Sequence, residues 1–270
     1  MGEVIACANQ KGGVGKTTTV VSLASYLAMA GMQVLVVDLD PQSNATSGFG
    51  VDRERLQGSS YDLLSAGGRV SELAIRTGVL GVSLIPAERD LAGVEIELVP
   101  LRDREQRLVQ ALRPDAESYD YVLLDCPPSL GLLTVNALTA ADSVLIPIQC
   151  EFYALEGLTQ LMSTIDLVRD GLNPRLTIKG VVMTMFDGRT TLSTDVANEV
   201  RRHLGDLVFD VIVPRSVRLA EAPGYGRPIS LYSPESRGAH AYRALANEVL
   251  ERGGRSGQAM TQASVSAAVR

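Results

Sequence analysis

The apolar positions of the chain fall into short continuous runs, and longer amphipathic segments lie between them. A run in which successive residues are all apolar indicates a strand covered on both faces, as in a parallel sheet. On this pattern we predict strands at residues 3–8, 33–40, 82–87, 121–125, 143–149, 178–186, 207–214 and 229–232.

The intervening segments carry helical patterns. In residues 193–204, Val196, Val200 and Leu204 share one helix face, and Gly205 ends the run. Strands that alternate with helices predict an α/β fold: a doubly wound, mostly parallel sheet with helices on both faces. Helices are predicted at residues 16–30, 101–113, 154–170, 193–204 and 238–252.

Length and composition suit a globular protein. Of the 270 residues, 46% are hydrophobic and 21% are charged, which is ordinary for a soluble domain. No internal repeat is present, so we predict one domain over residues 1–252. Residues 253–270 are small and polar, without a bulky apolar side chain, and are predicted to be a disordered tail.

Several classes of protein are disfavoured by the sequence. No stretch approaches the ~20 apolar residues of a membrane span, and the N-terminus lacks the charged region of a signal peptide. Cys7, Cys126 and Cys150 match no zinc or disulfide spacing, which favours a reducing cytosol. His203 and His240 are predicted to be surface or packing residues. We therefore predict a cytoplasmic protein without a His/Cys metal site.

The segment NQKGGVGKTTT, residues 9–19, contains two of the three lysines of the chain. It lies between a predicted strand and a predicted helix, which is the context of a P-loop, although Gln10 replaces the usual first glycine. Its backbone N–H groups can bind phosphate oxygens, Lys16 can reach the β- and γ-phosphates, and the Thr17 hydroxyl can hold Mg²⁺. The predicted ATP-binding residues here are Lys11, Gly12, Gly13, Val14, Gly15, Lys16, Thr17 and Thr18.

Carboxylates follow two of the predicted strands. Asp38 and Asp40 end the strand 33–40, and Asp40 lies at the C-terminal edge, where ligands bind in open α/β sheets. Asp38 is predicted to be structural. Asp125 ends the apolar strand YVLLD, a Walker B pattern, and is predicted to hold Mg²⁺ through water. The predicted metal site is therefore Thr17, Asp40 and Asp125.

Longer motifs carry a family resemblance. KGGVGKT is the deviant Walker A signature, and with VDLDPQSNAT, YVLLDCPPSLG, PIQCEFYALEG and VRLAEAPGYGRPI it makes residues 3–250 resemble the ParA/Soj-type chromosome-partitioning ATPases. The resemblance implies hydrolysis of ATP to ADP and phosphate with Mg²⁺. It also implies an ATP-dependent homodimer, in which Lys11 contacts the nucleotide of the partner subunit.

The same resemblance implies roles for single residues. Lys11, Lys16 and Asp40 are the predicted catalytic residues. Lys11 would stabilise charge on the transferring phosphoryl group, as an arginine finger does, and Asp40 would position the attacking water. Asn44 and Thr46 would lie near the γ-phosphate and the metal. Pro214 would border the adenine, and base recognition stays open because Thr184 and Met185 follow the strand where relatives often carry Asn.

The charge distribution bears on nucleic-acid binding. A net charge of −6 and a pI of about 5.1 argue against it. However, residues 181–270 hold 11 basic and 9 acidic residues, a local net charge of +2. The resemblance places Arg189 and Arg218 where relatives bind DNA non-specifically. Arg201, Arg202, Arg215 and Arg227 could widen this surface.

The predicted partners are a second copy of the chain, non-specific DNA and a ParB/Spo0J-like centromere-binding protein that stimulates hydrolysis. The predicted location is therefore the nucleoid. Three alternative classes of protein share parts of this pattern. A MinD-like membrane-bound regulator needs a C-terminal amphipathic helix, which the tail lacks. A relative of the nitrogenase iron protein needs interface cysteines, of which Cys126 alone is suitably placed. A ParA-like protein that positions another cargo shares this chemistry and stays open.

Overall fold

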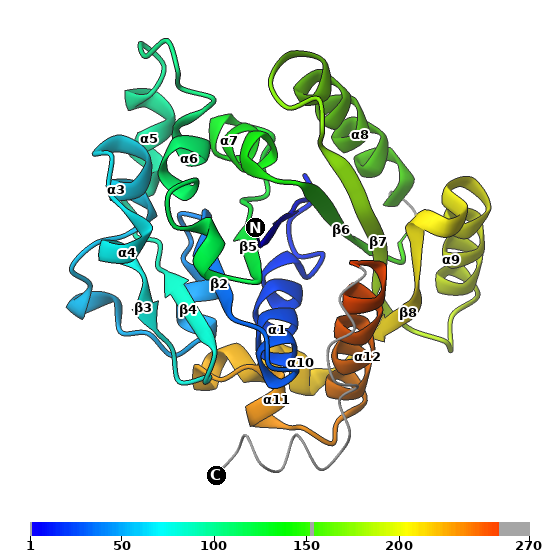
Figure 1. The fold of residues 1–270 in the computed structure, drawn as a ribbon. Coiled ribbons are helices and arrows are strands. Elements are labelled where there is room, and N and C mark those ends of the chain that lie inside the picture. Colours follow the sequence, from blue (N-terminus) through cyan, green and yellow to red (C-terminus); the bar gives the residue numbers. More distant parts are fainter. Residues whose placement is uncertain (1, 152–153, 254–270) are drawn as a thin grey trace.

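The computed structural model describes residues 2–151 and 154–253, and its centre is an eight-stranded sheet (Figure 1). The strand order is β3-β4-β2-β5-β1-β6-β7-β8, and every neighbouring pair is parallel except β3 and β4. The strands are β1 (Glu3–Cys7), β2 (Val34–Asp38), β3 (Ile75–Arg76), β4 (Val82–Ile85), β5 (Tyr121–Asp125), β6 (Ser143–Gln149), β7 (Thr177–Phe186) and β8 (Val208–Pro214).

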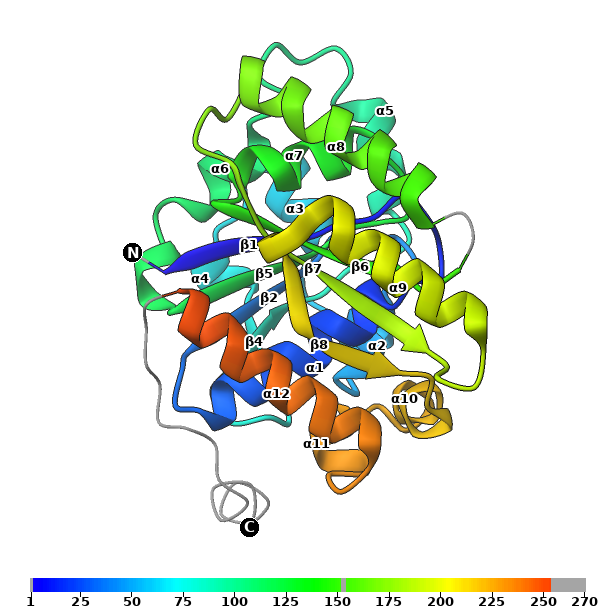
Figure 2. The ribbon, with the colours of Figure 1, turned by 90° about the vertical axis from the view of Figure 1, so that its right-hand side faces the viewer.

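Helices cover both faces of the sheet, with α1 and α12 on one face and α7 and α8 on the other (Figure 2). Each face has its own apolar core, because the strand residues point alternately to the two sides. The helices are α1 (Lys16–Met29), α2 (Asn44–Gly48), α3 (Ser60–Ser65), α4 (Val70–Leu73), α5 (Leu91–Glu97), α6 (Arg107–Leu112), α7 (Leu132–Ala140), α8 (Ala154–Gly171), α9 (Thr191–Leu204), α10 (Val217–Glu221), α11 (Ile229–Tyr232) and α12 (Arg237–Arg252). Short 3-10 helices are η1 (Arg53–Arg55), η2 (Ala116–Ser118), η3 (Gly205–Leu207) and η4 (Ala222–Tyr225).

The register of the central strands positions the candidate site. Asp125 of β5 lies beside Cys7 of β1 on one side and beside Asp38 of β2 on the other. Because these strands are parallel and in register, the loops that follow them leave the sheet at the same edge. The segments after Cys7, Asp38 and Asp125 therefore converge at one place.

The predicted doubly wound α/β fold is confirmed, and two predicted elements are wrong. Residues 229–232 form helix α11 instead of a strand, because an apolar run of four residues does not distinguish the two by periodicity. The predicted helix 101–113 is reduced to α6. The Asn136 side chain donates to the Arg104 carbonyl at 2.7 Å and accepts from the Leu108 amide at 3.2 Å, which holds a turn ahead of α6.

The single sheet runs through the chain from β1 to β8, and α12 packs back onto β8 and α1. One domain over residues 1–252 stays a prediction. The predicted disordered tail begins at Gly253, which follows the end of α12, and its remaining residues, 254–270, lie outside the described residues.

Candidate nucleotide-binding site

The loop between β1 and α1 owes its shape to glycine. Gly13 and Gly15 have φ angles of 74° and 91°, in the left-handed region that favours glycine. Gly15 is the N-cap of α1 and provides no side-chain cap, so no capping side chain in the described residues competes with another acceptor for the first N–H groups of this helix. A helix N-terminus of this kind is suited to binding an anion.

Lys16 stands in the first turn of α1 and is 5% exposed. Its ammonium donates to the Lys11 carbonyl at 3.2 Å. In the described part of the chain, no carboxylate lies within ion-pair distance of this ammonium. Because a buried cation is costly without an opposite charge, the position is built for an anionic ligand.

A cavity of about 360 Å³ opens above this loop. Its polar end includes Lys16, Thr17 and Asp40. Its other end is mainly apolar, which is the division expected for a ligand with phosphates and an aromatic base. Besides those three residues, the lining consists of Gly12, Gly13, Gly15, Thr18, Val21, Ser22, Gln42, Asn44, Ser47, Gly48, Pro128, Met185, Leu219, Ala222, Pro223, Arg227, Pro228 and Ile229.

The lining includes six of the eight predicted ATP-binding residues of the loop, whereas Val14, Lys11 and Pro214 lie outside it. Val14 is buried, and its carbonyl accepts a hydrogen bond from the Thr184 hydroxyl at 2.7 Å. Lys11 does not line the cavity, and neither does Pro214, which ends β8 beside Phe186. The apolar lining comes in part from Met185 and from residues between 219 and 229, and the place of Pro214 beside the adenine stays a prediction. Nothing in the sequence pattern distinguished these residues as cavity lining.

Asp38 is fully buried and holds the loop after β2 in place. One of its oxygens accepts from both the Thr46 amide, at 2.8 Å, and the Thr46 hydroxyl, at 2.7 Å. Its other oxygen accepts from the Asp40 amide. Burial raises the pKa of Asp38 to about 6, against the Thr46 hydrogen bonds, which lower it. The predicted structural role of Asp38 agrees with these contacts.

Thr46 is held by hydrogen bonds within the fold, and its place near the γ-phosphate and the metal stays a prediction. Its hydroxyl donates to Asp38 and accepts from the Ala87 amide at 3.0 Å, so it joins α2 to β2 and to the end of β4. Asn44, from the same loop, does line the cavity. The preceding Ser43 has a φ of 55°, a strained value for a residue other than glycine, and begins helix α2.

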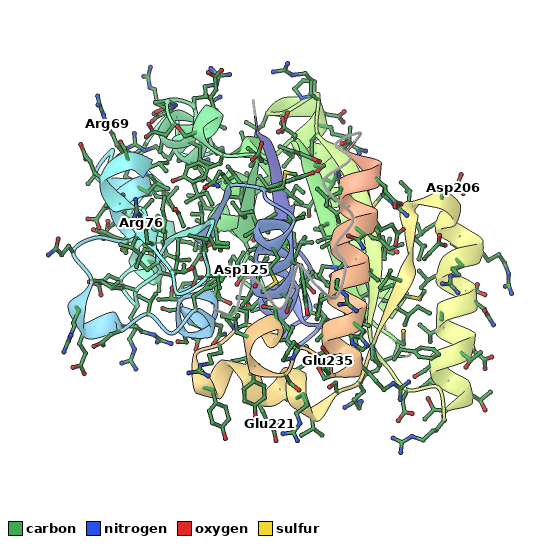
Figure 3. The ribbon with its side chains drawn as sticks, turned by 60° about the horizontal axis from the view of Figure 1, so that its bottom comes forward. Arg69, Arg76, Asp125, Asp206, Glu221 and Glu235 are labelled. Atoms are coloured by element: carbon green, nitrogen blue, oxygen red, sulfur yellow. The ribbon has the colours of Figure 1, made fainter. Side chains whose placement is uncertain are left out.

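Asp125 lies at the centre of the fold (Figure 3) and is fully buried. Among the described residues, neither of its carboxylate oxygens has a partner with hydrogen-bond geometry. Burial and the neighbouring Asp38 raise its pKa well above the usual value, whereas the nearby Thr17 hydroxyl and Lys16 ammonium lower it. An unsatisfied buried carboxylate needs an explanation in a native structure, and a cation or its bound water provides one.

Asp40 lies at the rim of the cavity and is 6% exposed. Its Oδ1 atom accepts from the Gln42 amide at 2.9 Å, which fixes the side chain. No hydrogen bond within the described residues uses Oδ2. This oxygen can therefore accept a hydrogen bond from a water in the cavity.

Lys11 points to a carboxylate instead of to the cavity. Its ammonium lies 2.8 Å from Oε2 of Glu151, at the end of β6, and Gln149 donates to the other oxygen of this carboxylate. The Lys11 amide donates to the Asn9 side chain, whose own amide group donates to the Pro147 carbonyl. Glu151 is a residue to which the sequence pattern assigned no role.

Two glycines outside the lining bring two of its segments together. Gly50, just after α2, and Gly226, just after η4, have φ angles of 72° and 60°. A Cβ atom at Gly50 would lie 2.7 Å from the Gly226 carbonyl oxygen, so neither position has room for a side chain. The backbone of the loop after β2 therefore packs directly on the segment that lines the apolar end.

The two arginines predicted to bind DNA are both exposed and both paired. Arg189 donates to the two oxygens of Asp187 at 2.8 and 2.7 Å, and these bonds lower the pKa of Asp187. Arg218 donates to Glu221 at 2.9 Å, on a segment at the periphery of the molecule (Figure 3). The sequence pattern did not indicate that each arginine has its own carboxylate.

The three cysteines are buried free thiols. Burial is the main factor that raises the pKa of each, to about 11 for Cys150, so all three are protonated at neutral pH. Among the described residues there is no cluster of three or more His, Cys, Asp or Glu side chains that could hold a metal.

Comparison with known proteins adds to this geometry. Residues 2–178 match the family described as an AAA domain. The chain is 53% identical to the chromosome-partitioning ATPase Soj of Thermus thermophilus, covering 92% of this chain and 95% of the relative. It is 52% identical to the chromosome partitioning protein ParA of Myxococcus xanthus, covering 93% and 89%.

Solved structures give the same fold. A Mycobacterium smegmatis protein, named as a cobyrinic acid a,c-diamide synthase and solved with ADP and magnesium, is 41% identical, with a TM-score of 0.82 over 96% of this chain and 98% of that one. The septum site-determining protein MinD of Pyrococcus horikoshii, solved with Mg-ADP, is 25% identical, with a TM-score of 0.76 over 94% and 98%. The relatives in partitioning are thus more similar in sequence than MinD.

Proposed function

Because the chain belongs to the Soj/ParA family of chromosome-partitioning proteins, we propose that it is a partitioning ATPase that binds DNA as an ATP-bound homodimer. The main support for the nucleotide site is the environment of Lys16. Its ammonium is buried, has no ion pair with a carboxylate in the described part of the chain, and lies next to a helix N-terminus whose glycines have left-handed φ angles. A triphosphate supplies the missing negative charge.

The residues at the polar end fit Mg²⁺ and ATP. Mg²⁺ prefers oxygen ligands and is usually bound by one or two carboxylates together with substrate phosphates and water. The Thr17 hydroxyl and the unsatisfied carboxylate of Asp125 supply such oxygens, and Asp40 lies at the cavity rim. Bound Mg²⁺ would neutralise charge on the phosphates. Lys16 would hold the β- and γ-phosphates, while Oδ2 of Asp40 would orient the attacking water.

Lys11 is proposed to act on the nucleotide of the other subunit. In the single chain its ammonium rests on Glu151, away from the cavity of its own subunit. The two side chains of this ion pair are each about 40% exposed, so Lys11 can readily exchange Glu151 for a stronger anion. The phosphates of a second subunit would attract Lys11 across the interface, so ATP would join the two copies.

DNA binding is proposed for the surface around Arg189 and Arg218. Both guanidinium groups are exposed and lie on the segments that follow β7 and β8, so phosphates can reach them. Arginine contacts to phosphate give affinity without sequence recognition and are sensitive to salt. Dimerisation would double the number of contacts, which offsets the negative net charge of the chain.

The remaining partner is a ParB/Spo0J-like centromere-binding protein that stimulates hydrolysis and releases the dimer from the nucleoid. The support for this partner is the identity of 52–53% to partitioning proteins. The MinD-like alternative has weaker support, at 25% identity. Within residues 2–151 and 154–253, none of the helices combines the length and the apolar character that a bilayer crossing needs.

The proposal is tested by measuring oligomer mass and retention on non-specific DNA in the same samples, with ATP, with ADP and without nucleotide. We expect a dimer and salt-sensitive retention only with ATP and Mg²⁺. Lys11→Ala should bind ATP but stay monomeric and leave the DNA. Equal DNA retention by the wild type with and without ATP would contradict the proposal.

A further inference from the structure

A second cavity, of about 720 Å³, lies on the sheet face opposite α1. It is bounded by the end of α5, by the loop before α6, by the start of α7 and by the C-terminal half of α8 (Figure 1). We name it the α5–α8 groove. Its lining is Glu95, Val99, Arg104, Glu105, Leu130, Gly131, Leu132, Val135, Thr164, Leu167, Val168 and Leu172.

Apolar side chains are unusually exposed at this groove. Leu167 of α8 is 72% exposed and Val99 on the opposite side is 55% exposed. Just outside the lining, Ile96 is 78% exposed. Large exposed apolar side chains that gather in one place indicate a surface that binds another molecule. Burial of such side chains is the main source of affinity for a partner.

The groove also contains a carboxylate with an unusual position. Oε1 of Glu95 is 3.5 Å from the Leu133 amide, in the first turn of α7, and a Cβ atom at Gly131 would lie 2.1 Å from it. No ion pair of Glu95 is found in the described part of the chain. The other lining carboxylate, Glu105, is paired with Arg104. Glu95 is therefore the lining carboxylate without an ion pair in the described residues, and it lies among apolar side chains.

We propose that the α5–α8 groove docks a helical segment of a partner protein that is apolar on one face and carries Lys or Arg beside that face. The apolar face would pack on Val99, Leu167 and Leu172, and a cation would pair with Glu95. A second copy of this chain fits the groove less well, because a two-fold contact would place a Glu95 carboxylate on both sides and would supply no cation to either.

The location gives the occupant a route to the nucleotide site. Glu95 contacts Gly131 and Leu133, a few residues beyond Asp125. A cation that pairs with Glu95 weakens its contact with the start of α7, and so acts on the segment that joins Asp125 to this helix. This coupling rests on the proposed function, because the proposed function assigns Asp125 a role in hydrolysis. The docking itself does not depend on the proposed function.

The test uses the full chain and a fluorescent synthetic helix of about 18 residues, with leucines on one face and lysines beside them. We expect the probe to bind and to slow hydrogen exchange at residues 95–105 and 164–172. Leu167→Asp should weaken binding about tenfold. Glu95→Gln should weaken it several-fold and reduce its dependence on salt. The matched control is Leu192→Asp, an exposed leucine on α9, which should bind as the wild type does.

Equal binding by Leu167→Asp, or by a probe with glutamates in place of lysines, would overturn the docking proposal. Displacement of the probe by a synthetic peptide with the sequence 254–270 would also overturn it, because the occupant would then be this segment of the chain. A dimer that forms without nucleotide and dissociates in Leu167→Asp would overturn it too, because the occupant would then be a second copy. ATP binding and turnover are measured on the same samples. Loss of ATP binding in the wild type would contradict the proposed function and leave the docking result standing. Turnover that the bound probe leaves unchanged would overturn the coupling alone.

Discussion

The phosphate loop and the arginine surface differ in how far each is prepared for its ligand. In the phosphate loop, Lys16 is buried without a carboxylate partner in the described part of the chain, and Asp125 is buried with two unsatisfied oxygens. On the arginine surface, Arg189 and Arg218 are exposed, and each already has a carboxylate. The first region is incomplete without a ligand, whereas the second is satisfied without one.

This difference predicts different strengths of binding. A buried, unsatisfied group regains a large electrostatic free energy when its ligand arrives, because the surrounding dielectric is low. An exposed pair gains little when a phosphate replaces its carboxylate, because water and salt screen both. A tight ATP site would thus control a weak DNA surface. Four substitutions, ordered from the largest expected effect to the smallest, test this contrast.

The largest effect is expected for hydrolysis in Asp40→Ala. The variant should bind ATP and accumulate as the dimer, because Oδ2 of Asp40 orients water and does not hold the phosphates. We expect its turnover to fall about 1,000-fold, as for the loss of a group that positions or deprotonates the nucleophile. Single-turnover hydrolysis measured beside oligomer mass checks this. A monomer with wild-type turnover would show that Asp40 has no such role.

The next effect is expected for ATP affinity in Lys16→Ala. Removal of a charge-assisted contact with the phosphates should weaken ATP binding about 100-fold. Without nucleotide, the variant should unfold within a few degrees of the wild type, because Lys16 has no ion pair in the described residues and only a longer-range attraction to Asp125. Titration with a fluorescent ATP analogue and thermal unfolding provide the two measurements.

Lys179→Ala is the matched control for this prediction. Lys179 is also largely buried, but it pairs with Glu3 at 2.9 Å on the β7 side of the sheet. Its removal should lower stability and leave ATP affinity unchanged. If ATP affinity falls by the same factor in both lysine variants, the effect comes from general destabilisation. The proposed contact of Lys16 with the phosphates would then be refuted.

The same contrast explains what the sequence predicted. The phosphate loop follows from local order: a strand, glycines, Lys16, Thr17 and a helix must lie in this sequence to bind phosphate. The doubly wound sheet follows equally from continuous apolar runs. The apolar end of the cavity did not follow, because Met185 and Ile229 reach it from separate elements, and the helix α11 that begins with Ile229 was predicted as a strand.

Tertiary contacts also decided the roles of single polar residues. The Thr46 hydroxyl is hydrogen-bonded to Asp38 and to the Ala87 amide, which come from two different strand ends. The pairing of Lys11 with Glu151 spans 140 residues, and no local pattern indicates it. The sequence thus predicted which residue types the site needs, and the fold decided which of them are available.

A smaller effect is expected for DNA binding in Arg218→Glu. Reversal of an exposed charge that contacts phosphate should lower DNA affinity about tenfold and reduce its salt dependence. ATP-driven dimerisation should not change. The matched control is Arg69→Glu, another exposed arginine, which lies on the far side of the molecule (Figure 3). DNA retention that is the same in both variants would remove Arg218 from the DNA surface.

The smallest effect has the opposite sign and is expected for Asp187→Asn. Asp187 accepts two hydrogen bonds from the guanidinium of Arg189, so a DNA phosphate must compete with a carboxylate for this group. Asparagine keeps the shape but removes the negative charge, and DNA affinity should rise about threefold. Asp206→Asn makes the same change of net charge at an exposed aspartate that has no arginine partner in the described residues. A rise in Asp187→Asn alone indicates that the paired carboxylate holds DNA affinity down, whereas an equal rise in both variants would reduce the effect to net charge.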